Sequence, residues 1–276
     1  MATPRRQGAD QHVLTVDSTE WLTSHLVRVN ASGESLADFG GNGHTDAYVK
    51  LLFVDSELGL EPPYDLAALR ASLPADRRPV VRTYTVRRVD RAARRLAIDF
   101  VTHGDTGVAA VWAAKAAPGD RLVASGPGGA YAPDPAVDWH VFAGDLSALP
   151  AIAAALETLP SDARGVAHVE IADPSDVLEL DHPADVTVNW LVNTDESDTA
   201  FLARAVAGGP WPAAVDAPGA VQVFAHGERE SVKAIRAVLR ERGVPREAIS
   251  ISGYWARGRT EDLFQAEKRE PIGRID

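Results

Sequence analysis

The sequence predicts a two-domain protein in which an N-terminal antiparallel six-stranded β-barrel is followed by a Rossmann-like parallel α/β domain. Its length of 276 residues is more than one hydrophobic core usually organises. The first half shows the alternation of apolar and polar residues that is typical of half-buried strands. In the second half, short apolar segments alternate with helical patterns, which indicates a parallel sheet with crossover helices.

Six segments of the first half have the alternation of barrel strands. They are residues 12–16, 24–29, 47–53, 80–89, 96–102 and 120–124. One helix is expected to begin after Thr106 or Gly107 and to end before Pro118, because proline and glycine break the pattern there. Pro62-Pro63, in the polar stretch after Phe53, is predicted to form a loop.

The pattern changes near residue 135, where two prolines flank Asp134. We therefore expect a barrel domain over residues 1–134 and an α/β domain with a C-terminal extension over residues 135–276. Five segments read as buried strands of the second domain: residues 140–143, 168–172, 186–192, 221–225 and 249–254. Apolar residues at helical spacing follow two of them, from Leu146 to Leu159 and from Val232 to Leu239.

Composition excludes several classes of protein. The net charge of −11 argues against nucleic-acid binding, and no apolar run reaches membrane-spanning length. The absence of cysteine excludes disulfides, thiolate metal sites and cysteine nucleophiles, and no histidine cluster has metal-ligand spacing. The basic N-terminal residues precede no apolar core, so we expect no secretion signal and a cytoplasmic protein. No apolar stripe calls for a partner, so a monomer is expected.

Arg82-Thr83-Tyr84-Thr85 is the segment that best indicates a cofactor. On a strand, Arg82 and Tyr84 project to one side and the two threonines to the other. A guanidinium donates paired hydrogen bonds to a diphosphate, and a phenol ring can lie against a planar heteroaromatic ring. An ordinary amphipathic strand is the alternative.

Positive charge is concentrated in two places of this acidic chain. Six arginines lie between Arg82 and Arg95, and further cations lie between Arg257 and Arg269. Such clusters focus a positive potential on an anionic ligand. Solvated, locally paired charges are the alternative, which we prefer for Arg91, Arg94 and Arg95.

In order and spacing, a series of short motifs resembles the siderophore-interacting proteins, flavin-dependent ferric-siderophore reductases of the ferredoxin reductase superfamily. The matching segments are residues 46–53, 82–87, 99–104, 112–113, 118–120, 126–129, 144–145, 148–152 and 253–258. The resemblance extends from about residue 12 to residue 270. It implies that the barrel binds FAD, that FAD carries the chemistry, and that no side chain acts as a nucleophile or metal ligand.

The resemblance also implies roles for individual residues toward FAD. Arg82 would neutralise the diphosphate, Tyr84 would pack against the isoalloxazine ring, and Thr85 would hydrogen-bond near its N5 edge. The other expected FAD contacts are Thr83, Asp99, Val101, His103, Gly107, Ala109, Ala110 and Trp112. Ala110 departs from the family, in which a serine hydroxyl is common at this position. A strand-end histidine with a local role and a core tryptophan are the alternatives for His103 and Trp112.

For the second domain, the resemblance implies a nicotinamide dinucleotide site in many relatives and a ferredoxin as electron donor in others. The expected contacts to NADPH or NADH are Gly144, Asp145, Ser147, His226 and Glu228. The full Gly-x-Gly-x-x-Gly fingerprint is absent, and Leu146-Ser147 stands where relatives commonly carry Glu-Thr. NAD(P)H is the preferred donor by a modest margin.

The expected substrate is a ferric siderophore, a large and often anionic chelate. Lys50 and Arg257 are expected to bind it, with Arg259 as a weaker candidate. Solvated cations are the alternative for all three. Three other functions remain open: a flavin-binding siderophore carrier or electron carrier without nicotinamide turnover, a two-domain binding protein without flavin, and a general flavin or ferric-citrate reductase.

Overall fold

The computed structural model describes residues 11–40, 43–102, 104 and 107–275, which form two compact units. The first unit lies within residues 1–43 and 47–129, and the second within residues 44–46 and 130–276. The predicted domain boundary between residues 134 and 135 stays a prediction. Among the described residues, no helix combines the length and the apolar composition that crossing a bilayer requires.

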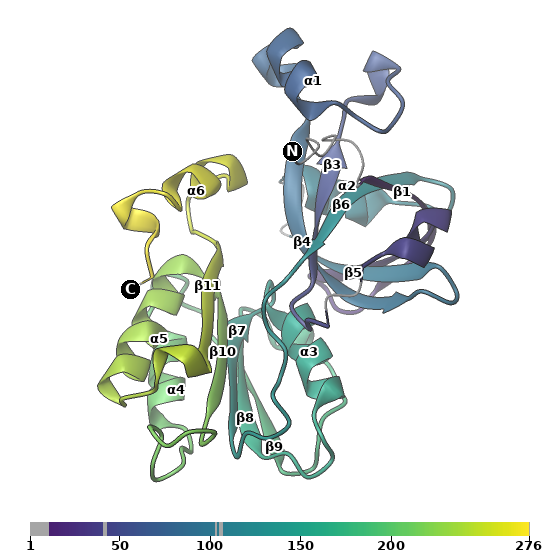
Figure 1. The fold of residues 1–276 in the computed structure, drawn as a ribbon. Coiled ribbons are helices and arrows are strands. Elements are labelled where there is room, and N and C mark those ends of the chain that lie inside the picture. Colours follow the sequence, from purple (N-terminus) through teal and green to yellow (C-terminus); the bar gives the residue numbers. More distant parts are fainter. Residues whose placement is uncertain (1–10, 41–42, 103, 105–106, 276) are drawn as a thin grey trace, which may run out of the picture. The chain divides into compact units, whose positions relative to one another are not determined.

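The first unit is a closed antiparallel barrel with the strand order β1-β2-β5-β4-β3-β6 (Figure 1). Its strands are β1 (Gln11–Trp21), β2 (Leu26–Ser32), β3 (Tyr48–Phe53), β4 (Val80–Asp90), β5 (Arg95–Val101) and β6 (Arg121–Gly128). The six-stranded barrel predicted from the sequence is therefore confirmed. β1 extends beyond the predicted end at Val16, because a bulge between Val16 and Ser18 shifts the alternation of its side chains.

Short helices complete this unit: η1 (Glu34–Asp38), η2 (Ser56–Leu58), α1 (Leu66–Ser72), η3 (Ala75–Arg77) and α2 (Val108–Lys115). α2 lies where a helix was predicted, and its Ala109 and Ala113 are buried in the barrel core. Pro62 and Pro63 lie outside the helices and strands, as predicted, and α1 follows them. Asp65 caps this helix by accepting hydrogen bonds from two of its first backbone N–H groups, and Leu69 packs beside a small satellite core.

The second unit is a five-stranded parallel sheet with the order β11-β10-β7-β8-β9 (Figure 1). Its strands are β7 (His140–Asp145), β8 (Gly165–Ile171), β9 (Val186–Val192), β10 (Gln222–Glu228) and β11 (Ile249–Trp255). The helices are α3 (Leu149–Thr158), η4 (Pro174–Asp176), α4 (Phe201–Gly208), α5 (Arg229–Glu241), η5 (Arg246–Ala248), α6 (Glu261–Glu267) and η6 (Pro271–Gly273). The parallel α/β prediction is confirmed, although the sequence analysis did not identify α4.

The strand order creates a switch point between β7 and β10. From β7 the chain moves outward to β8 and β9, and then returns to place β10 on the other side of β7. α4 and α5 pack together against the sheet, whereas α3 packs on β7. In open α/β sheets, ligands bind at the carboxyl ends of the strands on either side of such a point. The turns that follow Asp145 and Glu228 therefore lie where a ligand of such a fold would bind.

Candidate functional site

The segment Arg82–Thr85 lies in the middle of β4, beside β3. Its antiparallel register places Arg82 opposite Leu51, Thr83 opposite Lys50 and Tyr84 opposite Val49. Arg82 and Tyr84 therefore share one face of the strand, as the alternation predicts. The other face carries Thr83, which is exposed, and Thr85, which is buried.

Arg82 and Tyr84 are both half-buried, so their positions are restrained by the barrel. The Tyr84 ring lies 4.4 Å, centroid to centroid, from the ring of Phe100. Arg82 donates a hydrogen bond from Nη1 to the carbonyl oxygen of Val81 at 2.8 Å. A cation and an aromatic ring are thus held on one strand face, where a guanidinium can donate to a diphosphate and a phenol ring can lie against a planar ring. The roles of Arg82 and Tyr84 toward FAD stay predictions.

The N-terminus of α2 is the second part of the expected FAD site. Gly107 precedes the helix with a positive φ of +81°, and it has no side chain to cap the first turn. At this described N-cap position no side chain accepts from the first N–H groups, and N–H groups at a helix N-terminus bind phosphate well. The neighbouring Ala109 and Ala110 are buried. These residues fit a flavin dinucleotide, with backbone N–H groups in place of the missing hydroxyl at Ala110.

Two other predicted FAD contacts, Trp112 and Asp99, have different surroundings. Trp112 lies 5.8 Å from the ring centroids of both Phe53 and Phe100, so its ring is packed at the edge of the barrel core. Asp99 is buried and forms a two-pronged ion pair with Arg28 at 2.7 and 2.8 Å. This pair occupies both oxygens of the carboxylate.

Two FAD contacts were predicted where β5 ends. Val101 is half-buried and pairs with Leu26 of β2. His103 lies outside the described residues. The roles of Val101, His103 and Asp99 toward FAD therefore stay predictions.

In the second unit, Asp145 joins the ends of three strands. Its Oδ1 accepts hydrogen bonds from the backbone N–H of Ser147 at 2.9 Å and from the Ser147 hydroxyl. Its Oδ2 accepts from the backbone N–H of Glu228 at 2.9 Å and from the indole Nε1–H of Trp255 at 2.8 Å. The carboxylate thereby connects the end of β7 to the ends of β10 and β11.

Glu228 caps α5. Its Oε2 accepts from the backbone N–H groups of Glu230 and Ser231 at 2.6 and 2.9 Å, and its Oε1 accepts from the N–H of Arg257 at 3.1 Å. The side chain is only 4% exposed. The carboxylate therefore satisfies the N–H groups at the start of α5 and fixes the backbone after β11.

Glycine is required on both sides of the switch point. A Cβ atom at Gly144 would lie 2.6 Å from the Cβ of Ala148 and 2.7 Å from the carbonyl oxygen of His226. Gly227 has φ +141°, and a Cβ atom there would lie 2.7 Å from Asp145 Oδ2. The two glycines thus allow the strand ends and the Asp145 carboxylate to approach closely.

His226 is a buried core residue. Its ring stacks on Phe224 with centroids 4.0 Å apart, and its Nε2 is 3.0 Å from the hydroxyl of Ser250. Burial, together with the nearby charge of Lys268, lowers the pKa of His226 to about 3. The side chain is therefore neutral at physiological pH.

We expect this histidine to make folding stability depend on pH. The unfolded chain binds a proton near pH 6.5, whereas the folded chain does so near 3. Protonation thus favours unfolding, so the stability is complete above about pH 6.5 and falls by about 1.4 kcal/mol per pH unit below it. Urea denaturation should show a loss of about 2 kcal/mol between about pH 7.5 and pH 5 from His226 alone.

His226→Gln is the comparison for this prediction, because glutamine can still hydrogen-bond to Ser250 without titrating. Its free energy of unfolding should fall less steeply with pH than that of the wild type. Parallel profiles would contradict the prediction. Burial also lowers the pKa of His140 and His168, and these residues provide the acid sensitivity expected to remain in the variant.

Carboxylates also collect at the ends of β8 and β9, which the sequence analysis missed. Glu170 accepts a hydrogen bond from Asn193 Nδ2 at 2.8 Å, and burial raises its pKa. Asp195 and Asp198 follow in the loop after β9, and Glu196 between them lies 3.9 Å from Arg257. Glu170 lies in a segment that was predicted to be a strand, and ligand sites form at the carboxyl ends of such strands. This rule could have identified these carboxylates from the sequence.

The three predicted substrate cations lie in different units. Lys50 is exposed on β3 of the barrel, opposite Thr83. Arg257 and Arg259 follow β11 in the second unit, where the Arg257 guanidinium lies 5.7 Å from the Trp255 ring centroid. Arg259 forms an ion pair with Glu267 at 2.7 Å, which reduces the charge it can offer to a ligand. Their role in substrate binding stays a prediction.

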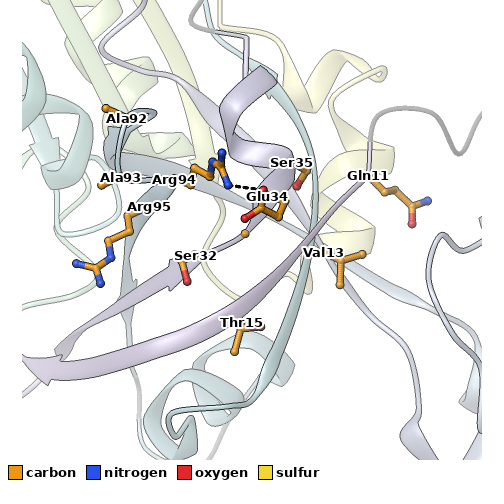
Figure 2. A pocket seen from close by; sticks show the side chains of 11 residues that line it. Gln11, Val13, Thr15, Ser32, Glu34, Ser35, Ala92, Ala93, Arg94 and Arg95 are labelled. Atoms are coloured by element: carbon orange, nitrogen blue, oxygen red, sulfur yellow. Dashed lines mark hydrogen bonds and ion pairs between the residues drawn. The ribbon is translucent and has the colours of Figure 1, made fainter.

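A cavity of about 820 Å³ opens on the barrel (Figure 2). It lies between the start of β1, the turn after β2 and the β4–β5 turn, and none of the predicted site residues lines it. Figure 2 shows Arg94 and Glu34 pointing toward each other, where they form an ion pair. Arg95 faces Asp17 at 3.5 Å. These two cations of the arginine-rich hairpin are thus locally paired, as expected from the sequence.

Comparison with known proteins gives matches to both units. The family model of a siderophore-interacting FAD-binding domain matches residues 15–131, and that of a siderophore-interacting protein matches residues 137–258. An uncharacterised protein of Mycobacterium tuberculosis is 48% identical over 273 residues, which are 95% of this chain and 96% of the relative. The ferric vibriobactin reductase of Vibrio cholerae is 36% identical over 253 residues, 90% of each chain.

A solved structure agrees with these matches. The siderophore utilization protein from T. fusca is 36% identical, with a TM-score of 0.76 over 91% of this chain and 94% of its own. The resemblance found in the sequence is confirmed, and so is FAD as the cofactor of the barrel. The chain belongs to the siderophore-interacting protein family.

Proposed function

We propose that this protein is an FAD-dependent ferric-siderophore reductase that releases Fe(II) from the chelate. The observation that carries the proposal is the similarity to a ferric vibriobactin reductase along 90% of both chains. The barrel supports it with a strand and a helix N-terminus that fit a flavin dinucleotide. Reduction releases the metal because hard oxygen ligands hold Fe(II) less tightly than Fe(III).

In this proposal the chain's own residues bind and orient the cofactor. Arg82 and the N–H groups at the start of α2 hold the diphosphate, whereas Tyr84 supports the ring system from the strand. Thr85 hydrogen-bonds the polar edge of the ring. Bound FAD supplies the electrons for the reduction of Fe(III), and the protein contributes proximity and electrostatics.

We propose that the reaction takes place in the cytoplasm and that the protein acts as a monomer. NAD(P)H as the electron donor, with a ferredoxin as the alternative, stays a prediction.

An anaerobic visible spectrum tests the proposed function. The FAD-reconstituted protein should be yellow, should lose its colour on reduction with dithionite, and should regain it when a ferric siderophore is added. A ferrous-iron indicator such as ferrozine should report one Fe(II) for each electron transferred. A protein that does not bind FAD, or a reduced flavin that the chelate leaves reduced, would overturn the proposal.

We expect Lys50→Ala and Arg257→Ala each to raise the KM for an anionic ferric chelate about fivefold at low salt, with FAD affinity unchanged. The reason is the loss of a cation that attracts the chelate, and the effect should shrink as salt screens it. Stopped-flow reoxidation of enzyme reduced beforehand with one equivalent of dithionite, over a series of chelate concentrations, would measure the chelate concentration that gives the half-maximal rate, which stands for KM in this single turnover. Arg70→Ala, which removes an exposed cation from α1, is the control. An unchanged KM in either variant would remove that residue from substrate binding.

A further inference from the structure

The hydrogen bonds in the turns at the switch point of the second unit differ from those of a dinucleotide-binding site. In a dinucleotide-binding sheet, the pyrophosphate takes N–H groups from the turn after the first strand and from the following helix N-terminus. β7 and α3 hold those positions here. A ligand can use these N–H groups only where the chain itself does not already supply their acceptor.

Acceptors from the chain itself satisfy several N–H groups of the β7–α3 turn. Ser147 N–H donates to Asp145 Oδ1 at 2.9 Å, and Ala148 N–H donates to the Asp145 carbonyl oxygen at 3.0 Å. The N–H groups of Ala151 and Ile152 both donate to the carbonyl oxygen of Ala148. Pro150 has no N–H group. The turn therefore offers a pyrophosphate few of the donors on which a dinucleotide fold depends.

The neighbouring strand end shows the same arrangement. Glu228 N–H donates to Asp145 Oδ2, and the first N–H groups of α5 donate to the Glu228 carboxylate. Gly227, whose missing side chain would admit a phosphate, instead admits the Asp145 carboxylate, since a Cβ there would lie 2.7 Å from Oδ2. The carboxylates of Asp145 and Glu228 thus accept the hydrogen bonds that a phosphate would accept in this crevice.

Charge opposes a dinucleotide as well. Glu170, Asp195, Glu196 and Asp198 belong to the adjacent strand ends and to the loop after β9. Arg204 is paired with Asp198, Arg257 faces Glu196, and Arg229 and Arg259 share Glu267. A pyrophosphate carries two negative charges, and a 2′-phosphate adds more. Like charges across a short distance raise the free energy of the bound state.

We infer that the crevice between the ends of β7 and β10 is filled by the carboxylates of Asp145 and Glu228 and holds no nicotinamide dinucleotide. Asp145 is a positioning residue that joins β7, β10 and Trp255. The inference rests on the proposed reductase function in one respect, because it states that the electrons for FAD come from a donor that is not held in this crevice. The residues predicted for NAD(P)H thus serve the fold of the second unit.

The test mixes oxidised FAD-reconstituted protein anaerobically with NADH or NADPH in a stopped-flow instrument. The rate of flavin bleaching should be slow and should rise linearly with nucleotide concentration up to about 1 mM, the upper end of ordinary Michaelis constants. Excess ADP-ribose or 2′,5′-ADP should leave the rate unchanged. Saturation at micromolar nucleotide, with competition by either analogue, would overturn the inference.

Binding without turnover is a second measurement on the same wild-type protein. Isothermal titration calorimetry with NAD⁺ and NADP⁺ should give no saturable heat below about 1 mM, and a defined micromolar Kd would contradict the inference. An experiment with dithionite-reduced protein tests the reductase function separately from nucleotide binding. Rapid reoxidation by a ferric siderophore supports the reductase whatever the nucleotide result, whereas failure of reoxidation removes the reductase and leaves the nucleotide result standing.

Discussion

Arg82→Ala is expected to lower the affinity for FAD by about 10- to 100-fold. Hydrogen bonds to charged groups are worth about 1.5–3 kcal/mol, and about 1.4 kcal/mol corresponds to a factor of ten in binding. Arg82 is half-buried on β4, and it shares the strand face of Tyr84, so its guanidinium is held before the cofactor arrives. Quenching of FAD fluorescence on titration with the apoprotein would measure the Kd.

Arg91→Ala is the matched control for this variant. It removes an exposed guanidinium from the turn of the same hairpin, and it should leave the Kd for FAD unchanged. Far-UV circular dichroism should show both variants folded. Equal FAD affinity in Arg82→Ala and wild type would contradict the role of Arg82 in diphosphate binding.

Alternation of side chains was enough to predict most of the fold. Strands β3, β4 and β9 match their predicted ranges within a residue at each end, because their apolar residues follow the period of a strand. The same period placed Arg82 and Tyr84 together. It failed at β1, where a bulge interrupts it, and at the short helices α1 and α4, which span fewer than three turns.

The contacts of the candidate site were less predictable because they join distant parts of the chain. Asp99 pairs with Arg28, 71 residues away, and Asp145 binds Glu228 and Trp255, which are 83 and 110 residues away. A local motif shows that a carboxylate follows a strand, and it does not show which donors reach that carboxylate. The motif of Asp145 therefore predicted a nucleotide contact, which stays a prediction, but it could not predict the hydrogen bonds of Asp145 to Glu228 and Trp255.

The anchoring role of Asp145 predicts a large loss of stability in Asp145→Asn, about 3 kcal/mol. Asparagine keeps the shape of the side chain, but one oxygen becomes an NH2 group that must face two donors. Leaving such groups unsatisfied costs about 1–3 kcal/mol each, and hydrogen bonds to the charge are lost as well. Urea denaturation would measure the free energy of unfolding, and a shift in tryptophan emission should report the change around Trp255.

Asp195→Asn is the control that separates the contribution of the turn from that of the strand ends. Asp195 Oδ1 accepts from the N–H and hydroxyl of Ser197, which repeats the arrangement of Asp145 with Ser147, but Asp195 is exposed. Its substitution should therefore cost much less free energy of unfolding than that of Asp145, because water replaces the lost partners. If both variants lost the same free energy of unfolding, the hydrogen bonds within the turn alone would account for the loss in Asp145→Asn. A much larger loss in Asp145→Asn assigns the difference to Glu228 N–H and Trp255, the bonds that tie β7 to β10 and β11.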